Sequence, residues 1–359
     1  MEAILIQKQS PVIPIRMNGR DLKPHKAIVN TKFGVRTVLA SNPWDFVALW
    51  LKREKKNKAS FYWQQARVFS DAAKGMPIAS APLLHYYTFM NAAKALLSSR
   101  GVIFDEHHGV KAHDLRKLSK RLTLSNEGVK IQKYGIAYAL SQYLGEVETN
   151  QVHSLEDLLF NIPCIHRTFC LTYKNQSDLF IPLTDCKYVY DKKSKQAYFS
   201  ARFSRDFKSK AYLRRLPPSF IEDKSIESDQ LAVRSVMSVP LTRSSITNSA
   251  NENSLRALQK SVRDDLNYIS GSQTLWYLKS VVSGHSRLNR QPLTLMLLAM
   301  HRLSEICRYR PIELDSFLSG QKNWLLTEFI QMVPSQFIDE ISSEITGYQV
   351  MIPNVRLAT

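Results

Sequence analysis

The apolar residues of the chain recur at helical spacing in some segments and alternate with polar residues in others. In LLHYYTFMNAAKALLSSRG, residues 83–101, Tyr86, Met90 and Ala93 follow one another at four- and three-residue steps. This spacing places them on one face of a helix, and Gly101 is typical of the residue that ends one. The pattern therefore predicts a helix with a broad buried face over residues 83–101.

Similar patterns predict helices on both sides of that segment. Asn42 precedes Pro43, the order favoured where a helix begins, and WDFVALWLKRE follows. SFYWQQARVFSDAAKG continues the helical spacing, and HDLRKLSKRL, residues 113–122, is predicted as a short helix with a basic outer face. Helices are expected again from Ser254, in LRALQKSVRDDLNYI, TLWYLKSVV, QPLTLMLLAMHRLSEICRYRP, NWLLTEFIQMVP and SQFIDEISSEI.

One segment has the period of a β-strand instead. In KYVYDKKSKQAYFSARF, Ala197, Phe199 and Ala201 alternate with more polar neighbours, and DKKSK separates two such runs like a hairpin loop. We therefore expect a small antiparallel sheet over residues 165–205, inserted in an otherwise helical protein.

The blocks themselves resemble a known family. WQQARVFSDAAKGMPIASAPLLHYYTFMNAAKALL, then HHGV, and far downstream ICRYRP are similar in order and character to the YaaC-like family of bacterial proteins. The resemblance spans residues 40–345 and carries no catalytic signature. It implies an architecture rather than an activity.

The block YYTFMNAAKALLSSRG…HHGV also resembles the central helix–loop–helix of HEPN domains, helical bundles found in toxin ribonucleases and antiviral systems. Catalytic HEPN proteins cleave RNA without a metal, using an Arg and a His separated by a few residues. The resemblance implies Arg100 and His107 as such a pair, with His107 as general acid or base and Arg100 stabilising charge on the phosphoryl group. A structural role for both residues is the alternative, because Gly101 follows Arg100 and would end the helix.

Together, these patterns and resemblances predict a mainly α fold of the α+β class. It comprises a HEPN-like helical bundle, a small inserted antiparallel sheet and a C-terminal helical region. The expected divisions are an irregular arm over 1–40, the bundle over 41–150, the sheet region over 151–220, a polar loop over 221–255 and helices packing on the bundle over 256–359.

The charge of the chain points to a polyanionic partner. It contains 49 Lys and Arg residues against 31 Asp and Glu, a formal net charge of +18. Such an excess attracts phosphate backbones by long-range steering and counterion release, for RNA and DNA alike. This hypothesis requires the cations to form a continuous surface.

Two basic segments are the candidate nucleic-acid contacts. In the second, Phe207 and Tyr212 lie among the cations, which suits stacking on unpaired bases and equally suits packing on a sheet. A solvated helix face is the alternative for either segment. The predicted contact residues are Lys111, Arg116, Lys117, Lys120 and Arg121 in the first segment, and Arg205, Lys208, Lys210, Arg214 and Arg215 in the second.

The histidines and cysteines do not form a recognisable metal motif. His107, His108 and His113 have poor ligand spacing, and the four cysteines contain no C-x-x-C pair. We expect one histidine to pack under Tyr86 or Tyr87, the others to face solvent, and no metal to bind. The cysteines are expected to be buried free thiols.

Other signals exclude common functional classes. No phosphate-binding glycine loop or dinucleotide fingerprint occurs, so no nucleotide cofactor, and no cofactor of any kind, is expected. The longest strongly apolar stretch, LTLMLLAM, is short for a membrane span, and the first residues lack a signal-peptide pattern, which predicts a cytoplasmic protein without a membrane partner. Arg308 and Arg310 oppose the dipole of the helix they end, and the RY-P block suggests a buried ion pair between helices.

The leading functional hypothesis is a basic YaaC-like protein that binds nucleic acid. The HEPN resemblance implies an accessory or sensor role in a bacterial antiviral or toxin-like system. One alternative is a metal-independent endoribonuclease using Arg100 and His107. Another is a protein-interaction scaffold for an acidic partner, and a homodimer is also compatible with the sequence.

Overall fold

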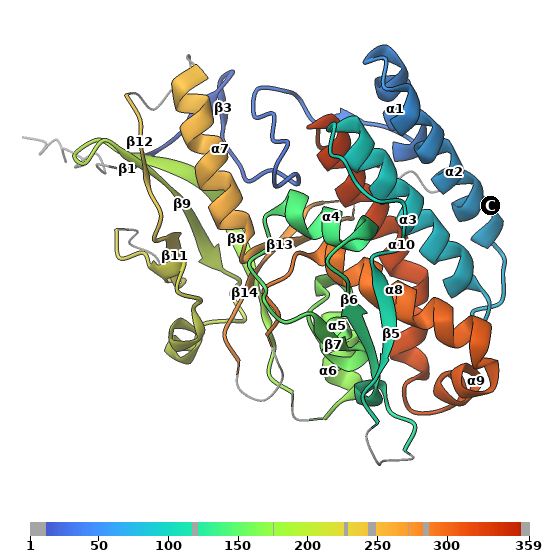
Figure 1. Ribbon diagram of the computed structural model, residues 1–359. Coiled ribbons are helices and arrows are strands. Elements are labelled where there is room, and N and C mark those ends of the chain that lie inside the picture. The colour runs from blue at the N-terminus through green and yellow to red at the C-terminus, as the bar shows by residue number, and fades with distance from the viewer. Residues whose placement is uncertain are drawn as a thin grey trace, which may run out of the picture.

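The computed structural model describes residues 12–116, 121–174, 176–225, 229–242, 249–271, 273–282 and 287–352. Of these residues, 46% are helical and 19% lie in strands. Most helices gather on one side of the molecule, and a large curled antiparallel sheet occupies the other (Figure 1). None of the described helices combines the length and the hydropathy needed to cross a membrane.

The helical side is built around α3 (Ala81–Ser99), the helix expected from the spacing of its apolar residues. Fourteen of its 19 residues are buried, because α2, α8 and α10 surround it. The rings of Phe89 on α3 and Phe337 on α10 stack with their centroids 3.9 Å apart. The other helices are α1 (Pro43–Arg53), α2 (Asn57–Ala73), α4 (Gly135–Leu144), α5 (Leu155–Phe160), α6 (His166–Thr172), α8 (Pro292–Tyr309), α9 (Pro311–Ser319) and α10 (Asn323–Thr346).

A three-stranded antiparallel sheet covers α8 where a basic helix was predicted. It consists of β5 (Val110–Asp114), β6 (Glu127–Ile131) and β7 (Val152–Ser154). The prediction of a helix over 113–122 was wrong for the described part, because VKAHD alternates with period two and pairs with β6. Lys117 and Lys120 lie outside the described residues.

The large sheet contains eight described strands, all antiparallel. Their order is β10-β11-β9-β8-β14-β13, with β1 added to β8 and β12 added to β9. Helix α7 (Ser249–Arg263) packs against this sheet (Figure 1). The strands are β1 (Val12–Pro14), β8 (Phe180–Asp191), β9 (Gln196–Phe203), β10 (Phe220–Glu222), β11 (Ala232–Ser235), β12 (Val239–Pro240), β13 (Leu266–Ile269) and β14 (Leu275–Lys279).

The prediction of a mainly α fold with a HEPN-like bundle and a small inserted sheet was therefore wrong. The β8–β9 hairpin around DKKSK is as expected, but the sheet also recruits strands from the N-terminal arm and from the stretch predicted as a polar loop. TLWYLKSVV, predicted as a helix, supplies β14. Short apolar runs like these do not distinguish a strand from a helix by periodicity alone, and their partners lie far away in the sequence.

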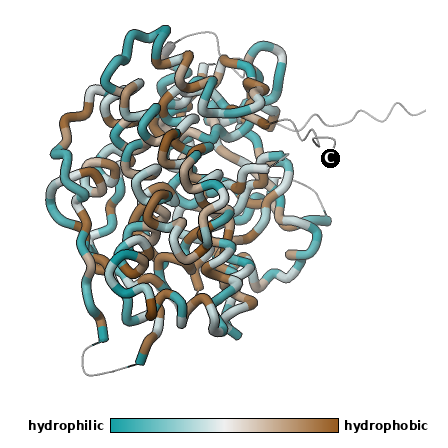
Figure 2. Tube along the Cα trace, turned by 90° about the vertical axis from the view of Figure 1, so that its right-hand side faces the viewer, coloured by the Kyte–Doolittle hydropathy of each residue, from teal (hydrophilic) through white to brown (hydrophobic). Residues whose placement is uncertain are grey.

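Each side has its own hydrophobic core. Phe89, Leu298 and Phe337 belong to a helical core, and Tyr188, Phe199 and Leu258 belong to a sheet core between the large sheet and α7. Hydrophobic residues run through the interior of the chain trace, whereas hydrophilic ones lie mainly on the outer loops (Figure 2). The two cores are held together by polar contacts that are themselves buried.

Lys26 makes the first of these contacts. Its Nζ donates to Asp339 of α10 at 2.9 Å and to the carbonyl of Val350 at 2.9 Å, and the hydroxyl of Tyr268 on β13 donates to Asp339 at 2.8 Å. Both charged side chains are buried, so each depends on the other. This ion pair joins the N-terminal segment, the sheet and α10.

Glu344 makes the second contact, one turn further along α10. Its carboxylate accepts the backbone N–H groups of Ile28, Val29 and Asn30 and the hydroxyl of Tyr143 at 3.1 Å. Residues 25–30 are therefore fastened to α10 at two points. The nearby short strands β2 (Arg16–Met17) and β3 (Arg20–Asp21) form a hairpin, and β4 (Val38–Leu39) pairs in parallel with β15 (Val350–Met351).

Replacing Lys26 with Met tests how much the first contact stabilises the fold. The change leaves Asp339 buried without its cation, so we expect the free energy of unfolding to fall by about 3–5 kcal/mol. Urea unfolding followed by circular dichroism measures it. Arg16→Ala is the control, because Arg16 forms an exposed ion pair with Asp21 and should cost about 1 kcal/mol or less. Equal losses in the two variants would contradict the assigned role, and Lys26→Met/Asp339→Leu should recover part of the stability.

Candidate functional site

The HHGV block packs on α3 and α8 through one of its histidines. His108 Nδ1 lies 2.5 Å from the hydroxyl of Tyr86, and the two rings stack with centroids 5.5 Å apart. His301 of α8 meets the edge of Tyr86 at 5.0 Å, and its Nδ1 lies 3.7 Å from Glu305. The prediction that one histidine packs under Tyr86 or Tyr87 is confirmed, with His301 as a third member.

Two glycines explain why the block adopts this position. The N–H groups of Ile136 and Ala137, at the start of α4, donate to the carbonyls of His107 and His108 at 2.8 and 3.1 Å. The backbones approach so closely that a Cβ on Gly135 would lie 2.5 Å from the nitrogen of Gly109, and both glycines have positive φ. HHGV therefore supplies acceptors for the orphan donors of a helix as well as a histidine for the cluster.

The histidines of this cluster are neutral at physiological pH. Burial lowers the pKa of His301 to about 3, and the charges of His108 and Arg302 contribute. Burial also lowers the pKa of His108, with a further contribution from Lys94. Burial raises the pKa of the Tyr86 phenol. The cluster is therefore an uncharged hydrogen-bonded group.

Arg100 and His107, the implied catalytic pair, have different surroundings. The guanidinium of Arg100 is directed to α10, where it donates to the carbonyl of Glu344 at 2.6 Å and to that of Ile345. The His107 side chain is 75% exposed and lies 3.6 Å from Asp105. Arg100 therefore caps the C-terminal end of α10, and the two side chains make no contact with each other in the hydrogen bonds and ion pairs described here.

Arg116, a predicted nucleic-acid contact, belongs to a buried ion-pair cluster. Glu127 of β6 is fully buried and binds Arg116 at 2.6 Å, Arg302 at 2.5 Å and Arg310. Arg116 and Arg310 also bind Glu313 at 2.6 and 2.8 Å. Arg310 of the RY-P block does pair with a buried carboxylate, but Glu127 lies on a strand, so the expectation of a buried ion pair between helices was wrong about the partner.

The solvent face of β5 and β6 carries lysines without acidic partners. Lys111 and Lys130 stand directly opposite each other in the antiparallel register, and both are exposed. Neither forms an ion pair with a described residue. His113 lies two residues further along the same face of β5, and Arg121 is exposed nearby in sequence. Like charges directly opposite each other destabilise a sheet, so a bound anion would relieve this arrangement.

The second predicted segment follows β9 and ends in the short 3-10 helix η3 (Lys210–Arg215). Arg205, Lys208, Lys210 and Arg214 are exposed, and none of the four forms an ion pair within the described ranges. We call these four residues the 205–214 cations.

Other side chains of this segment attach it to the large sheet. Arg215 donates to the carbonyl of Asp178 and to Ser280 Oγ at 3.2 Å, so it holds the segment against the sheet. Phe207 is buried and contacts Tyr212 at 4.9 Å between centroids. The aromatic rings therefore pack on the sheet, and the cations remain as the groups available to a partner.

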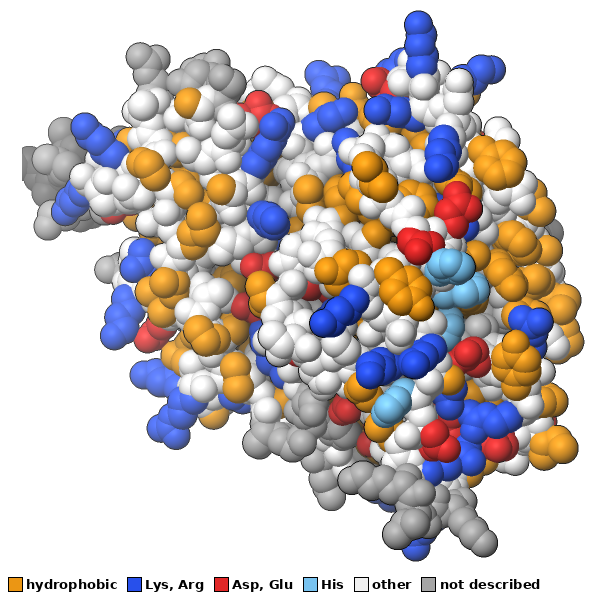
Figure 3. All heavy atoms as spheres, viewed as in Figure 1, with side chains coloured by type: hydrophobic (Ala, Val, Ile, Leu, Met, Phe, Trp, Pro, Cys, Tyr) orange, Lys and Arg blue, Asp and Glu red, His pale blue; other side chains and the backbone are white. Residues whose placement is uncertain are grey.

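The cations do not form a single band on the face shown in Figure 3. Lysine and arginine side chains are spread over this face, with hydrophobic and acidic side chains between them (Figure 3). A continuous cationic surface was the requirement of the polyanion hypothesis. Local groups of cations, rather than one track, are what this face offers.

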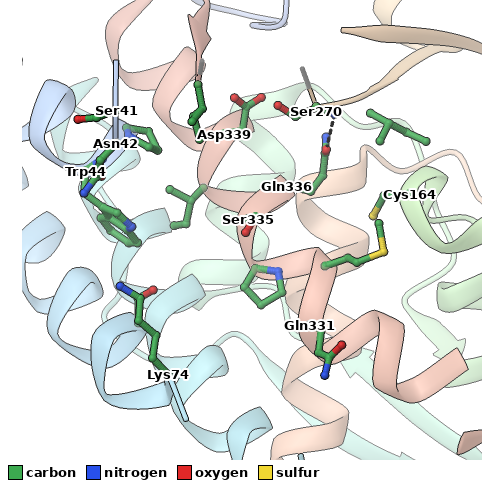
Figure 4. Close-up of a pocket in the computed structure, with 18 residues that line it drawn as sticks. Ser41, Asn42, Trp44, Lys74, Cys164, Ser270, Gln331, Ser335, Gln336 and Asp339 are labelled. Carbon is green, nitrogen blue, oxygen red and sulfur yellow. Dashed lines mark hydrogen bonds between the residues drawn. The ribbon is translucent and has the colours of Figure 1, made fainter. Parts of the chain in front are cut away.

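A cavity of about 780 Å³ lies between the start of α1, the end of α2 and the middle of α10 (Figure 4). Two of its polar side chains already have partners: Gln336 accepts the N–H of Ser270 at 2.8 Å, and Asp339 binds Lys26. Burial raises the pKa of the Cys164 thiol to about 12, so this cysteine is not a thiolate. The cavity holds no cluster of reactive side chains.

Among the described residues, one group has the proximity of metal ligands. Atoms of His166, Cys170 and Asp178 lie within 4.8 Å of one another. His166 Nδ1 is 2.9 Å from the carbonyl of Phe160, and its Nε2 accepts the N–H of Leu179 at 2.9 Å. Because both ring nitrogens are occupied, His166 has no lone pair for a metal without local rearrangement.

The chain is thus an α+β protein in which buried polar contacts join a helical core to a curled antiparallel sheet. Exposed cations form local groups on its surface. The family model of the YaaC-like proteins matches residues 35–345, and the chain belongs to this family. Comparison with curated proteins found no match, and comparison with solved structures found none either.

Glu127→Gln tests the ion-pair cluster through its pH dependence. Burial raises the pKa of Glu127, but hydrogen bonds from Arg310 and Arg116 and the charge of Arg302 outweigh it and lower the pKa to about 2. Ionised Glu127 therefore stabilises the fold above its ordinary pKa, and this contribution disappears as the pH falls toward 2.

We expect the variant to lose about 3–5 kcal/mol at pH 7, because three arginines lose their shared buried carboxylate and Arg302 keeps only Glu305, 3.4 Å away. The difference in unfolding free energy between the variant and the unchanged protein should become smaller below about pH 4, because the Glu127 carboxyl then begins to be protonated. Urea unfolding at pH 7, 4 and 3 measures it, with the exposed Glu54→Gln as control. A gap that stays constant over this range would contradict the assigned pairing.

Arg100→Ala and His107→Ala separate a structural role from a catalytic one. Because Arg100 binds two carbonyls of α10, its removal should lower the unfolding free energy by about 1.5–3 kcal/mol. Removal of the exposed His107 should change it by less than about 0.5 kcal/mol. Thermal unfolding measures both, alongside incubation with RNA in EDTA. If the unchanged protein cleaves RNA and both variants are folded but do not, Arg100 and His107 would be a catalytic pair after all.

Proposed function

We propose that this YaaC-like protein binds nucleic acid through its phosphate backbone, with the 205–214 cations as the main contact. The observation that carries the proposal is the exposure of four cations within ten residues, none of them paired with a carboxylate of the described chain. Elsewhere on the surface, cations such as Arg53 and Lys74 do have acidic neighbours. The unpaired group is therefore free to neutralise phosphates.

The packing of this segment supports a contact of defined shape. Arg215 and the buried Phe207 fix its backbone against the sheet, so the four cations project from a supported loop and short helix. Phosphate contacts carry no sequence information of their own. We therefore propose binding without strong sequence preference, as an accessory function, to either RNA or DNA.

Lys111 and Lys130 extend the proposal to a second surface. Their direct opposition on β5 and β6 costs stability in the free protein, and a phosphate placed between them would remove that cost. Lys111→Gln/Lys130→Gln should therefore weaken nucleic-acid binding without lowering the unfolding temperature. A loss of stability in this variant would argue that the lysines have a structural role instead.

The salt dependence of binding tests the main contact. Four neutralised phosphates predict a slope of log K against log salt of about −2.8 on a single strand and about −3.6 on a duplex. Fluorescence anisotropy with labelled RNA and DNA of random sequence measures it. Lys208→Gln/Lys210→Gln/Arg214→Gln should weaken binding to every sequence and reduce the slope by about 2–3.

The matched control is Arg53→Gln/Lys58→Gln/Lys74→Gln, which removes the same charge from exposed cations that have carboxylate partners. This control should retain most of the affinity and the slope. Equal losses in both triple variants would show that net charge alone attracts nucleic acid. Absence of binding at low salt would remove the proposed function.

A further inference from the structure

The N-terminal segment, expected to be an irregular arm, encloses a cavity of about 840 Å³. One wall is the β2–β3 hairpin, the opposite wall is the segment 33–37, and Gln349 closes one side. The hairpin lies beside the large sheet, apart from β5 and β6 (Figure 1). The volume of the cavity is within the range of small-molecule pockets, which is roughly 300–1,000 Å³.

The walls are held in place by specific contacts. Asn18 and Gly19 both have positive φ, the geometry of a tight two-residue hairpin turn. Asn18 Nδ2 donates to the carbonyl of Gly34 at 3.0 Å, and a Cβ on Gly34 would lie 3.1 Å from Met17 Cε. The Ile15 and Leu22 backbones bond to Tyr188 of β8 at 2.9 and 2.8 Å. The cavity is therefore part of the fold.

Three of the lining side chains are cations without an acidic partner. Arg20, Lys23 and Arg36 are exposed, and none of them pairs with a carboxylate in the described part of the chain. The acidic residue of the wall, Asp21, is already bound by Arg16 at 3.1 Å. The cavity therefore has a net positive lining.

His25, also a lining residue, adds a neutral donor. Its Nδ1 accepts the N–H of Ala27 at 2.9 Å, so the ring hydrogen is on Nε2. That Nε2 is buried, and backbone hydrogen bonding at Gly347 acts on the ring. Burial lowers the pKa of His25 to about 3, and the charges of Arg263 and Lys26 lower it further against the opposing effect of the Ala27 and Gly347 backbone.

We propose that this cavity is a binding site for a small ligand with two adjacent phosphate groups. Arg20, Lys23 and Arg36 balance its charge, and His25 lines the same cavity. Three cations match a diphosphate better than a single phosphate, which carries a charge of about −1.5 to −2 at neutral pH. Guanidinium groups also bind two phosphate oxygens at once. The site is separate from the 205–214 cations and does not depend on nucleic-acid binding.

Isothermal titration calorimetry of the full chain with inorganic pyrophosphate tests the site, at constant ionic strength and with sulfate as the comparison anion. We expect saturable binding with one site per chain and weaker binding of sulfate. Arg20→Gln and Arg36→Gln should each reduce the affinity about tenfold, since each removes a charge-assisted hydrogen bond. Both residues are exposed, so both variants are expected to fold, which circular dichroism checks.

Lys208→Gln/Lys210→Gln/Arg214→Gln is the matched control and should bind pyrophosphate unchanged while losing nucleic acid. The absence of saturable binding would overturn the proposal. So would an affinity that both arginine variants leave intact, or one that the control variant lowers equally. Binding of oligonucleotides that Arg20→Gln and Arg36→Gln weaken, without any binding of pyrophosphate, would assign the cavity to nucleic acid and would also overturn the proposal.

Discussion

Three carboxylates buried on one helix constrain the whole molecule. Asp339, Glu340 and Glu344 follow one another along α10, and a buried charge without a partner destabilises a protein strongly. Asp339 is satisfied by Lys26 and Glu344 by the backbone of residues 28–30, so both depend on the N-terminal segment. Burial raises the pKa of Glu340 to about 7, and Gln336 donates a hydrogen bond to it. The helical and sheet cores are joined because Asp339 and Glu344 of α10 require donors that residues 26–30, distant in the sequence, supply.

The long helices were predictable because their information is local. The spacing of Tyr86 and Met90 and the stop at Gly101 gave α3, and Asn42 before Pro43 gave the start of α1, where the Asn42 side chain does accept a hydrogen bond from Trp44. The sheet was not predictable in extent, because its strands pair across long sequence separations. TLWYLKSVV has apolar residues that suit either element, and only its register against β8 decides the matter.

For the candidate sites too, features set by local sequence could be predicted, and features that depend on distant partners could not. Exposure of the 205–214 cations and the contact of His108 with Tyr86 could be anticipated from composition and from the HHGV block. The roles of Arg100 and Arg116 could not, since the sequence around an arginine is the same whether its side chain reaches solvent or a buried acceptor. Their partners, the carbonyls of α10 and Glu127, are remote in sequence or belong to another element. In the arm expected to be irregular over residues 1–40, Asn18-Gly19 is a typical hairpin signal and forms the turn between β2 and β3, whereas the loop that completes the cavity carries no such signal.

The contact between Lys26 and Asp339 joins residues 313 positions apart. During synthesis, the N-terminal segment leaves the ribosome long before α10 exists, so neither Lys26 nor the N–H groups of residues 28–30 can find their native acceptors. Domains generally fold as the chain emerges, beginning at the N-terminus. In this protein the segment around Lys26 can be secured only after α10 has been made. The N-terminal segment therefore reaches its native contacts only once α10 has been synthesised, and a nascent chain truncated before α10 would expose the surfaces that this helix joins.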